Sequence, residues 1–147
     1  MKTRLSASFV AVLVALAPGL LGACGGGSGG KKVEVSLVDF NVEPQTTSVA
    51  AGKVKFVITN NGSFVHEFVV DRADDAAALP LEDNGEVNED KIGDSDHLGE
   101  AEDIDPGKST TLTVTMTAGK YVLFCNRVDG TKVHFKNGMH ADFTVTS

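Results

Sequence analysis

Short stretches of apolar residues, some alternating with polar residues and some continuous, recur along the chain and predict β-strands. Each stretch is five to seven residues long and lies near Gly, Asn or Pro residues typical of turns. The six stretches are residues 33–38, 53–59, 66–70, 110–115, 121–125 and 141–146. No heptad, no repeat of 20–50 residues and no alternation of strands with helices competes with this pattern. The chain is therefore predicted to form an all-β sandwich.

An acidic segment at residues 71–105 interrupts the strand pattern. It holds fourteen Asp or Glu residues against Arg72 and Lys91, a net charge of −12, and no sustained apolar period. Only the run Ala-Ala-Ala-Leu at 76–79 hints at a helical turn. We predict an acidic insertion between strands. Two roles stay open: a solvated loop that aids solubility, and a surface of single sign that attracts a basic partner.

The N-terminus has the pattern of a signal peptide. Lys2 and Arg4 precede a nine-residue apolar run at 9–17, which is shorter than the roughly 20 residues that span a bilayer. The sequence Leu-Gly-Ala-Cys that ends at Cys24 resembles a bacterial lipobox, in which the cysteine becomes the lipid-bearing first residue. The alternative is ordinary secretory cleavage nearby, which leaves Cys24 as a thiol in the tail.

The signal-peptide pattern divides the chain into three predicted parts. We assign residues 1–23 to a lipoprotein signal peptide, 24–32 to the lipidated cysteine with a Gly-rich tether, and 33–147 to one folded domain. The tether is predicted to be flexible, with a span of about 13–15 Å. The mature chain keeps 11 of the 13 basic residues against 20 acidic ones, a net charge of −9, so nucleic acid is a poor partner. The predicted location is the extracytoplasmic face of a bacterial membrane, where the lipid anchors a monomer.

The remaining cysteine, Cys125, has no disulfide partner if Cys24 is acylated. An exposed thiol in an oxidising compartment is vulnerable, and either burial or metal ligation protects it. A buried, inert core cysteine is the alternative to a ligand. His134 and Met139 follow Cys125 closely, and His66 lies upstream. Two imidazoles, a thiolate and a weak axial thioether are the donors of blue-copper sites, so this set is suited to copper.

Two segments resemble the cupredoxin family. Residues 120–146 are similar to its ligand loop, in which Cys, His and Met follow one another between the last two strands. The spacing Cys125-x8-His134-x4-Met139 resembles the copper domains of copper nitrite reductases, and the Gly-Met-His at its end resembles small bacterial lipoprotein cupredoxins related to plastocyanin and azurin. Residues 61–68 resemble the segment that carries the family's first histidine. The acidic insertion lies outside the resemblance.

The resemblance implies a Greek-key β-sandwich that binds one copper ion cycling between Cu(I) and Cu(II). It implies that His66, Cys125 and His134 are the in-plane ligands and that Met139 is the axial ligand. His134 is expected to form the exposed edge of the site, with His66 buried. Water is expected to be excluded by three aromatic residues, Phe64, Phe124 and Phe135.

Hydrogen bonds around the ligands are expected from Glu67 and Asn126. The family often has Asn at the position of Glu67, so the usual cross-link between the two ligand segments is in question here. The other histidines fit the site less well. His97 lies in the acidic segment and is expected to face solvent, and His140 begins the last strand, where it is expected to point away from Met139.

Enzymatic functions gain little support from the sequence. A pair of Cys125 and His134 resembles a nucleophile and its base, but no oxyanion site or substrate cleft accompanies it. Oxidase or nitrite reductase activity needs further copper centres, and four histidines are too few for them. The expected function is non-enzymatic electron transfer between extracytoplasmic redox partners, one of which has a basic docking face. The alternative is capture, buffering or delivery of Cu(I) to a copper enzyme.

Overall fold

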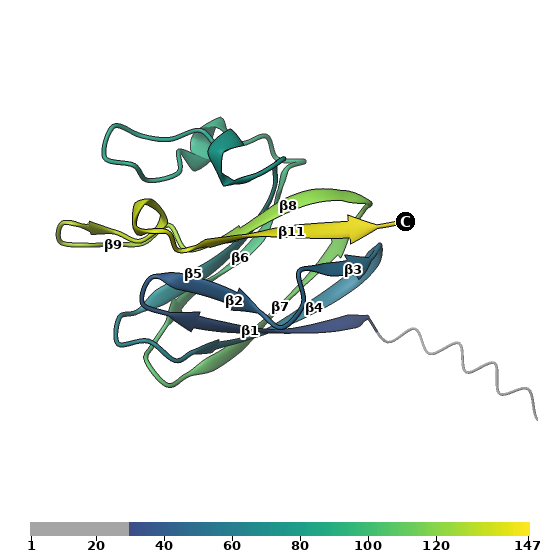
Figure 1. Cartoon of the computed structure of the whole chain (residues 1–147), viewed down its shortest axis with the longest axis horizontal. Helices are drawn as coiled ribbons and strands as arrows, with labels where there is room; N and C mark the ends of the chain where they lie inside the picture. The colour runs from purple at the N-terminus through teal and green to yellow at the C-terminus, as the bar shows by residue number, and fades with distance from the viewer. Residues whose placement is uncertain (1–29) are drawn as a thin grey trace, which may run out of the picture.

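Two β-sheets pack face to face in residues 30–147, the part of the chain that the computed structural model describes (Figure 1). The first sheet has the strand order β2-β1-β4-β7, and the second has the order β3-β11-β8-β5-β6. The first contains β1 (Lys31–Val38), β2 (Asn41–Pro44), β4 (Gly52–Asn60) and β7 (Ser109–Met116). The second contains β3 (Ser48–Ala50), β5 (His66–Arg72), β6 (His97–Ile104), β8 (Gly119–Phe124) and β11 (His140–Thr146). The predicted all-β sandwich is confirmed.

Smaller elements project beyond the sheets. The strands β9 (Val128–Asp129) and β10 (Lys132–Val133) form a separate two-stranded hairpin. Three single turns of 3₁₀ helix are η1 (Ala76–Ala78), η2 (Glu89–Lys91) and η3 (Phe135–Asn137). Apart from these turns, residues 30–147 contain no helix, and so none with the length and apolar character needed to cross a membrane. The predicted signal peptide, Cys24 and most of the tether lie outside the described residues.

Both sheets are mixed. β1 runs parallel to β4, and β11 runs parallel to β3, whereas the other neighbouring strands are antiparallel. The six predicted strands correspond to β1, β4, β5, β7, β8 and β11. Alternation did not predict β2, β3, β9 and β10, which have two to four residues each and are too short to show a period. It also did not predict the eight-residue β6, whose sequence is acidic and mostly not buried.

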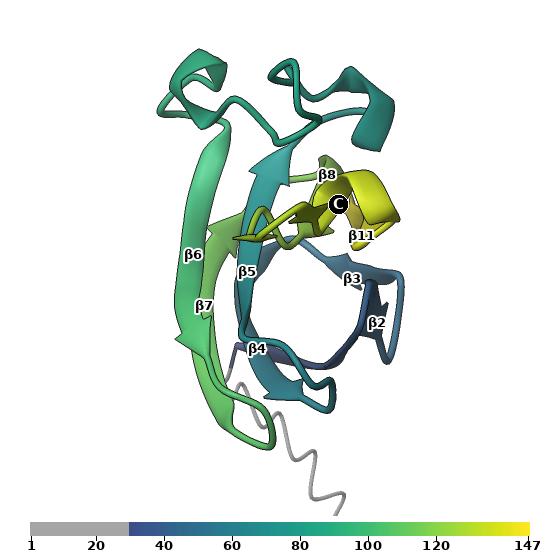
Figure 2. The same ribbon diagram turned by 90° about the vertical axis from the view of Figure 1, so that its left-hand side faces the viewer.

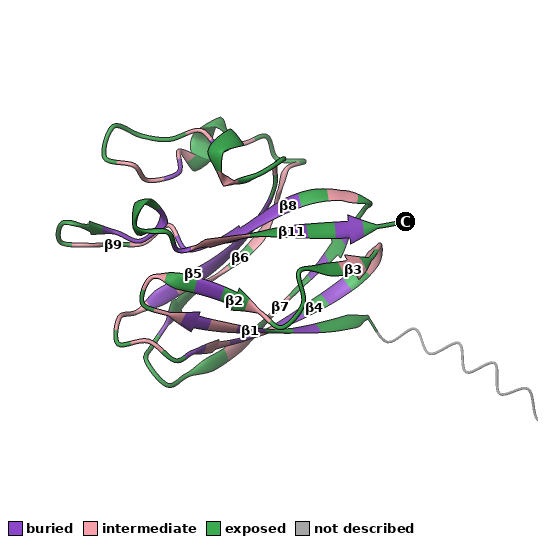
Figure 3. Cartoon of the chain, in the orientation of Figure 1, coloured by how far each residue is buried: buried purple, intermediate pink, exposed green. Residues whose placement is uncertain are grey.

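Alternating burial along β4 shows how the sequence specifies the core. Val54, Phe56 and Ile58 are fully buried between the sheets, while Lys53 and Lys55 point to solvent. Burial of each such apolar side chain contributes about 1.5–3 kcal/mol. Figure 3 shows the same alternation as purple bands on strands that face the opposite sheet.

Strand β8 is buried on both faces. Tyr121 and Leu123 point into the core between the sheets, and Val122 and Phe124 point outward into a second apolar cluster. That outer cluster also contains Val69, Phe135 and two buried residues of the acidic segment, Leu79 and Val87. The acidic segment therefore packs its few apolar residues against the outer face of the five-stranded sheet.

The predicted acidic insertion, residues 71–105, contains the edge strand β6. This strand, residues 97–104, pairs with β5 and so belongs to the five-stranded sheet. The part outside the sheets is residues 73–96, which we call the acidic excursion. In Figure 2 the acidic excursion lies at one end of the sandwich, beyond the ends of β5 and β6.

Candidate metal centre

Three of the predicted donors meet at one end of the sandwich. His66 begins β5, Cys125 directly follows β8, and His134 lies between β10 and η3. Because β5 and β8 are antiparallel neighbours, the start of one lies beside the end of the other. His66 Nδ1 lies 3.1 Å from His134 Nδ1, and Cys125 Sγ lies 3.3 Å from His134 Nδ1 and 3.8 Å from His66 Nδ1. All three side chains are fully buried.

The far nitrogen of each imidazole faces a carboxylate. His66 Nε2 lies 2.9 Å from Asp39 Oδ1, and His134 Nε2 lies 2.9 Å from Asp129 Oδ2. The first contact is a hydrogen bond, and in the second the charge of Asp129 lies directly beside the imidazole. A carboxylate beside Nε2 favours the tautomer that carries its proton there. Both Nδ1 atoms then present lone pairs to the same small space.

Two facing lone pairs 3.1 Å apart cannot form a hydrogen bond with each other. Burial lowers the pKa of both His66 and His134, and the charge of His66 lowers the pKa of His134 further. The neutral forms are therefore favoured, which is the protonation state that binds metals. A cation placed between the two nitrogens satisfies both lone pairs at once.

Asp39 is held rigidly in the turn between β1 and β2. It accepts hydrogen bonds from the amide and hydroxyl groups of Ser63 and from the amide of Phe64. Burial acts to raise the pKa of Asp39, but these bonds and the one to His66 outweigh it and hold the pKa at about 2. A side chain at Gly62 would collide with Asp39 Oδ1, so glycine leaves room for this contact. The carboxylate is ionised at neutral pH.

The Cys125 sulfur lies in a dry site near the backbone amides of Glu67 and Arg127. The amide of Glu67 donates to Cys125 Sγ at 3.4 Å. Burial raises the pKa of the Cys125 thiol to about 12, so the metal-free side chain is protonated. A metal that binds this sulfur must displace the proton.

Met139 closes the ligand loop, which we define as residues 125–139. Its side chain is fully buried in the same apolar cluster as Cys125. The Cys125 amide donates to the Met139 carbonyl at 3.1 Å, and the Met139 amide donates to the His134 carbonyl at 3.1 Å. These two backbone hydrogen bonds fix Met139, the predicted axial donor, relative to Cys125 and His134.

Glu67 forms the cross-link that its identity had put in question. Its carboxylate oxygen Oε1 accepts the Asn126 amide at 2.6 Å and so joins the two ligand segments. The Asn126 side chain accepts from the Val87 amide at 2.7 Å and donates to the Val87 carbonyl at 2.9 Å. It also donates to Glu89 at 2.9 Å. Asn126 therefore clamps the acidic excursion onto the residue that follows Cys125.

The expectation that His134 forms an exposed edge is wrong. Its side chain is fully buried, as is that of His66. The ring centroids of Phe40 and Phe64 lie 5.0 Å and 6.0 Å from that of His134, and Asp129 on the hairpin covers Nε2. The hairpin occupies most of the eight residues between Cys125 and His134. The hairpin within the ligand loop therefore shields the His134 imidazole from solvent.

The aromatic residues expected to exclude water divide into two groups. Phe64 packs near His134, with Phe40 stacked on it at a centroid distance of 5.6 Å. Phe124 and Phe135 instead belong to the outer cluster on the far side of β8. Phe40 was not predicted from the sequence, because nothing in its local pattern distinguishes it from other turn residues.

The remaining histidines lie outside the donor cluster. His97 is half-buried rather than free in solvent, and its Nδ1 lies 2.9 Å from the buried Asp71 carboxylate. His140 packs against Phe135, with ring centroids 5.0 Å apart. The three-donor cluster of the described residues contains neither of them.

Sequence reasoning also missed both carboxylates beside the imidazoles. Asp129 was seen only as part of an Asp-Gly turn signal, although its place five residues before His134 on a hairpin is a usable hint. Asp39 is 27 residues from His66, and no local pattern joins them. Only the pairing of β1 beside β4 brings that turn to the start of β5.

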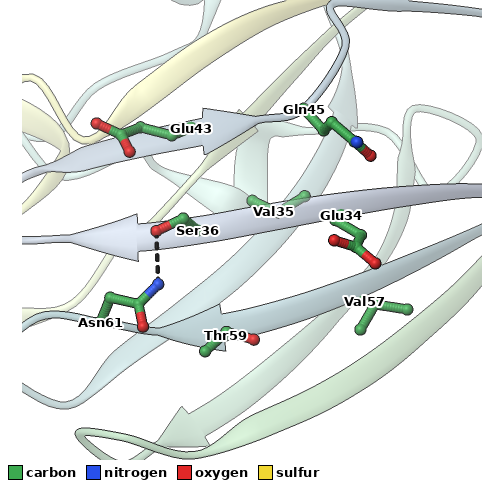
Figure 4. A pocket seen from close by; sticks show the side chains of 8 residues that line it. All are labelled: Glu34, Val35, Ser36, Glu43, Gln45, Val57, Thr59 and Asn61. Carbon is green, nitrogen blue, oxygen red and sulfur yellow. Dashed lines mark hydrogen bonds between the residues drawn. The ribbon is translucent and has the colours of Figure 1, made fainter.

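The donor set fits copper. Two neutral imidazole nitrogens, one thiolate and a thioether combine soft and borderline ligands, which suits both oxidation states of this metal. One cluster of three donors implies one ion. A separate hollow lies on the outer face of the four-stranded sheet and is lined mainly by polar residues on or directly after β1, β2 and β4 (Figure 4). None of the donors reaches it.

Comparisons with known proteins agree with this fold and donor set. A family model described as a cupredoxin-like domain matches residues 8–139. Copper-resistant cuproprotein CopI of Pseudomonas aeruginosa is 27% identical over an aligned length of 140, and the match covers 78% of this chain and 76% of that protein.

Solved structures with the same fold include reduced auracyanin of Roseiflexus castenholzii. It has a TM-score of 0.59 and 21% identity, and the match covers 80% of this chain and 98% of that one. Rusticyanin of Thiobacillus ferrooxidans has a TM-score of 0.54 and 20% identity, with coverage of 78% and 76%. An azurin of Methylomonas sp. strain J has a TM-score of 0.54 and 17% identity, with coverage of 80% and 98%.

Proposed function

This chain belongs to the cupredoxin-like family, and on that premise we propose that it carries single electrons between redox proteins. The observation that carries the proposal is the buried set of His66, Cys125 and His134, whose imidazole lone pairs converge within 3.1 Å. Bound copper supplies a reversible one-electron couple between Cu(I) and Cu(II) at such a site. The proposed role is that of a carrier and not of an enzyme.

The protein residues prepare this site before any metal arrives. Asp39 fixes the orientation of His66, and Asp129 faces the far nitrogen of His134. The hydrogen bond between Glu67 and Asn126 holds the two ligand segments together. Small structural change on electron transfer requires such prior fixing of the donors, because a mobile ligand rearranges when the metal charge changes.

Water exclusion supports the same proposal. The donors are fully buried, and the rings of Phe40 and Phe64 cover His134. A dry site limits the solvent rearrangement that accompanies a change of charge. Met139 is proposed as the weak axial donor because it is buried and bonded through its backbone to both loop donors.

Copper loading followed by spectroscopy and voltammetry tests the carrier function. With one equivalent of Cu(II), the protein is expected to become intensely blue or green through charge transfer from the thiolate, and to cycle reversibly at an electrode. The zinc-loaded protein is the colourless control. Cys125→Ser is expected to abolish the colour while the fold persists, because serine is nearly the same size. An unchanged visible spectrum in Cys125→Ser would refute the site.

Copper handling is the second candidate function. It is favoured by the similarity to the P. aeruginosa protein, which is named for copper resistance. In that case copper is the cargo, and the protein captures, buffers or delivers Cu(I). A protein that stays colourless with Cu(II), binds Cu(I) tightly and transfers it to a competing chelator supports handling and contradicts electron transfer.

We further propose that the chain is a lipoprotein at the extracytoplasmic face of a bacterial membrane. The support is the sequence that ends at Cys24 together with the Gly-rich tether. Metabolic labelling with a radioactive fatty acid is expected to mark the wild-type protein and not Cys24→Ala. Equal labelling of both proteins, or of neither, contradicts lipidation at this residue.

A further inference from the structure

An apolar groove separates the acidic excursion from the ligand loop and the start of β11. Its walls include Ala76, Ala77 and Leu81 from the acidic excursion, and its floor includes Phe135 and His140. The groove has a volume of about 510 Å³. Figure 2 shows the first part of the acidic excursion above the yellow coil that holds η3, and the groove lies between them.

The floor of this groove lies next to two proposed copper ligands. Phe135 directly follows His134, and His140 directly follows Met139. The two rings are 5.0 Å apart, and Phe135 also packs on Phe124 at 5.5 Å, the residue before Cys125. A molecule seated in the groove therefore contacts side chains adjacent in sequence to two donors, and through Phe135 it is one ring away from Phe124, which precedes the third.

Leu81 marks the groove as a contact surface. Its side chain is 48% exposed, and among the described residues only one other large apolar side chain, Val128, is comparably exposed at 38%. A single exposed leucine is ordinary, but Leu81 lies beside Ala76, Ala77 and Phe135 in a groove with a polar rim, which is the layout of contact surfaces.

The charge around the groove selects the kind of partner. The acidic excursion carries nine Asp or Glu residues against one basic residue, Lys91. Glu82 and Asp83 lie at the groove itself. The one cation there, Lys136, donates to the Asn84 carbonyl at 3.2 Å and is thus engaged by the acidic excursion. Glu82 and Asp83 outnumber this cation, so the net charge around the groove is negative.

The rival surface is the hairpin that covers His134. Val128 is exposed there, but the neighbouring charges are mixed: Arg127 and Lys132 are basic and Asp129 is acidic. Arg127 pairs with Asp103 at 2.5 Å, and the Lys132 ammonium lies 4.2 Å from the centroid of Phe64. This face has no net charge that would attract one class of partner, whereas the acidic groove does.

We propose that the groove is the docking surface for a basic redox protein that inserts an apolar side chain beside Leu81 and surrounds it with Lys or Arg residues. This inference rests on the proposed electron-transfer function for its purpose, but the surface is testable by itself. The Asn126 clamp to Val87 supports it, because the acidic excursion is fixed to the ligand loop and presents one shape.

Binding of the full-length protein to a basic c-type cytochrome, with and without copper, tests the surface. The dissociation constant is measured at about 10 mM and about 150 mM ionic strength, where the Debye lengths are about 30 Å and 8 Å. Binding is expected to weaken at the higher salt. Leu81→Ser and Asp83→Lys are each expected to weaken binding about five- to tenfold at low salt.

Matched controls use the same changes elsewhere. Val128→Ser removes the other exposed apolar side chain, and Glu43→Lys reverses a charge at the hollow on the four-stranded sheet. Both are expected to keep the dissociation constant within about twofold of wild type. Absence of wild-type binding overturns the proposal, as does loss of binding in Val128→Ser with Leu81→Ser unaffected. Equal effects in all four variants overturn it too.

A small reagent separates this inference from the proposed function. Reduction of the Cu(II) protein by hexaammineruthenium(II) needs no protein docking surface, because one electron passes from the small complex to the copper. At about 150 mM ionic strength, where surface charges are screened, all variants are expected to react with it at similar rates. If the reagent fails to reduce the wild-type Cu(II) protein while Leu81→Ser still weakens cytochrome binding, electron transfer is wrong and the docking surface stands.

Discussion

Asp39 Oδ1 lies 2.9 Å from His66 Nε2, and this contact joins the turn after β1 to the first residue of β5. Carboxylates placed in this way orient a histidine ligand and make its other nitrogen more basic. A more basic Nδ1 stabilises the higher metal charge. The contact is thus expected to favour Cu(II) over Cu(I).

Asp39→Asn keeps the size of the side chain and an oxygen acceptor but removes the charge. Cu(II) affinity is expected to fall about tenfold, as is usual when such a partner of a ligand is changed. If Cu(I) affinity is unchanged, the reduction potential rises by about 59 mV. Protein-film voltammetry measures this shift, and Glu43→Gln on the remote face is the control. A potential that stays at the wild-type value contradicts the role of Asp39.

Gly62→Ala tests the same contact by steric means. The added Cβ would collide with Asp39 Oδ1 and lie 2.9 Å from His66 Nε2. Stability is expected to fall by about 1–3 kcal/mol, as for an overpacked site, and the visible spectrum of the copper form is expected to shift. Gly93→Ala is the matched control, because its Cβ would have only Asp96 Oδ2 nearby, at 3.8 Å. Urea denaturation compares the two, and equal stabilities would show that the turn absorbs the clash.

Asn126→Ala is expected to release the acidic excursion. The Val87 amide and carbonyl lose their partner while Val87 itself is buried, which costs about 1–3 kcal/mol. Hydrogen exchange in residues 73–96 is expected to accelerate more than exchange in the sheets. Asn84→Ala, which changes an exposed side chain of the same segment, is the control. Uniform acceleration over the whole domain would mean that Asn126 supports the fold generally.

Asp71 makes stability depend on pH. Burial raises its pKa to about 6 from the ordinary value of 3.8, against the opposing effect of His97. The folded state then binds a proton more tightly than the unfolded state between about pH 4 and 6. The free energy of unfolding is therefore expected to fall as pH rises through this window, by on the order of 2 kcal/mol.

Asp71→Asn removes this titration. Urea denaturation at several pH values from 4 to 7 is expected to show a smaller decline in the variant than in wild type. Asp105→Asn, at an exposed position outside the strands, is the control. Parallel curves for wild type and Asp71→Asn contradict a buried carboxyl group with a raised pKa.

The sequence predicted the parts of this molecule that depend on local pattern. Alternation in residues 53–59 marks β4 because every second side chain enters the core. The ligand loop is recognisable because Cys125, His134 and Met139 lie within fifteen residues. Resemblance to the cupredoxin family is confirmed by the family match.

Features that depend on distant contacts were not predictable in this way. His134 is buried by the hairpin of β9 and β10, whose strands have two residues each, and by Phe40. Phe40 lies far away in the sequence, in the turn between β1 and β2. Asp39 meets His66 only after β1 has paired with β4. The acidic excursion was read as polar, and its buried Leu79 and Val87 have no period that would reveal them.

The central claim is that His66, Cys125 and His134 hold one copper ion in both oxidation states. X-ray absorption at the copper edge of the fully loaded protein tests it most directly, because it identifies the near ligands of the metal. The account predicts two imidazole nitrogens and one sulfur at short distance in both Cu(II) and Cu(I), with little change between them. A copper ion without a short sulfur ligand, or one that loses an imidazole on reduction, would contradict the account.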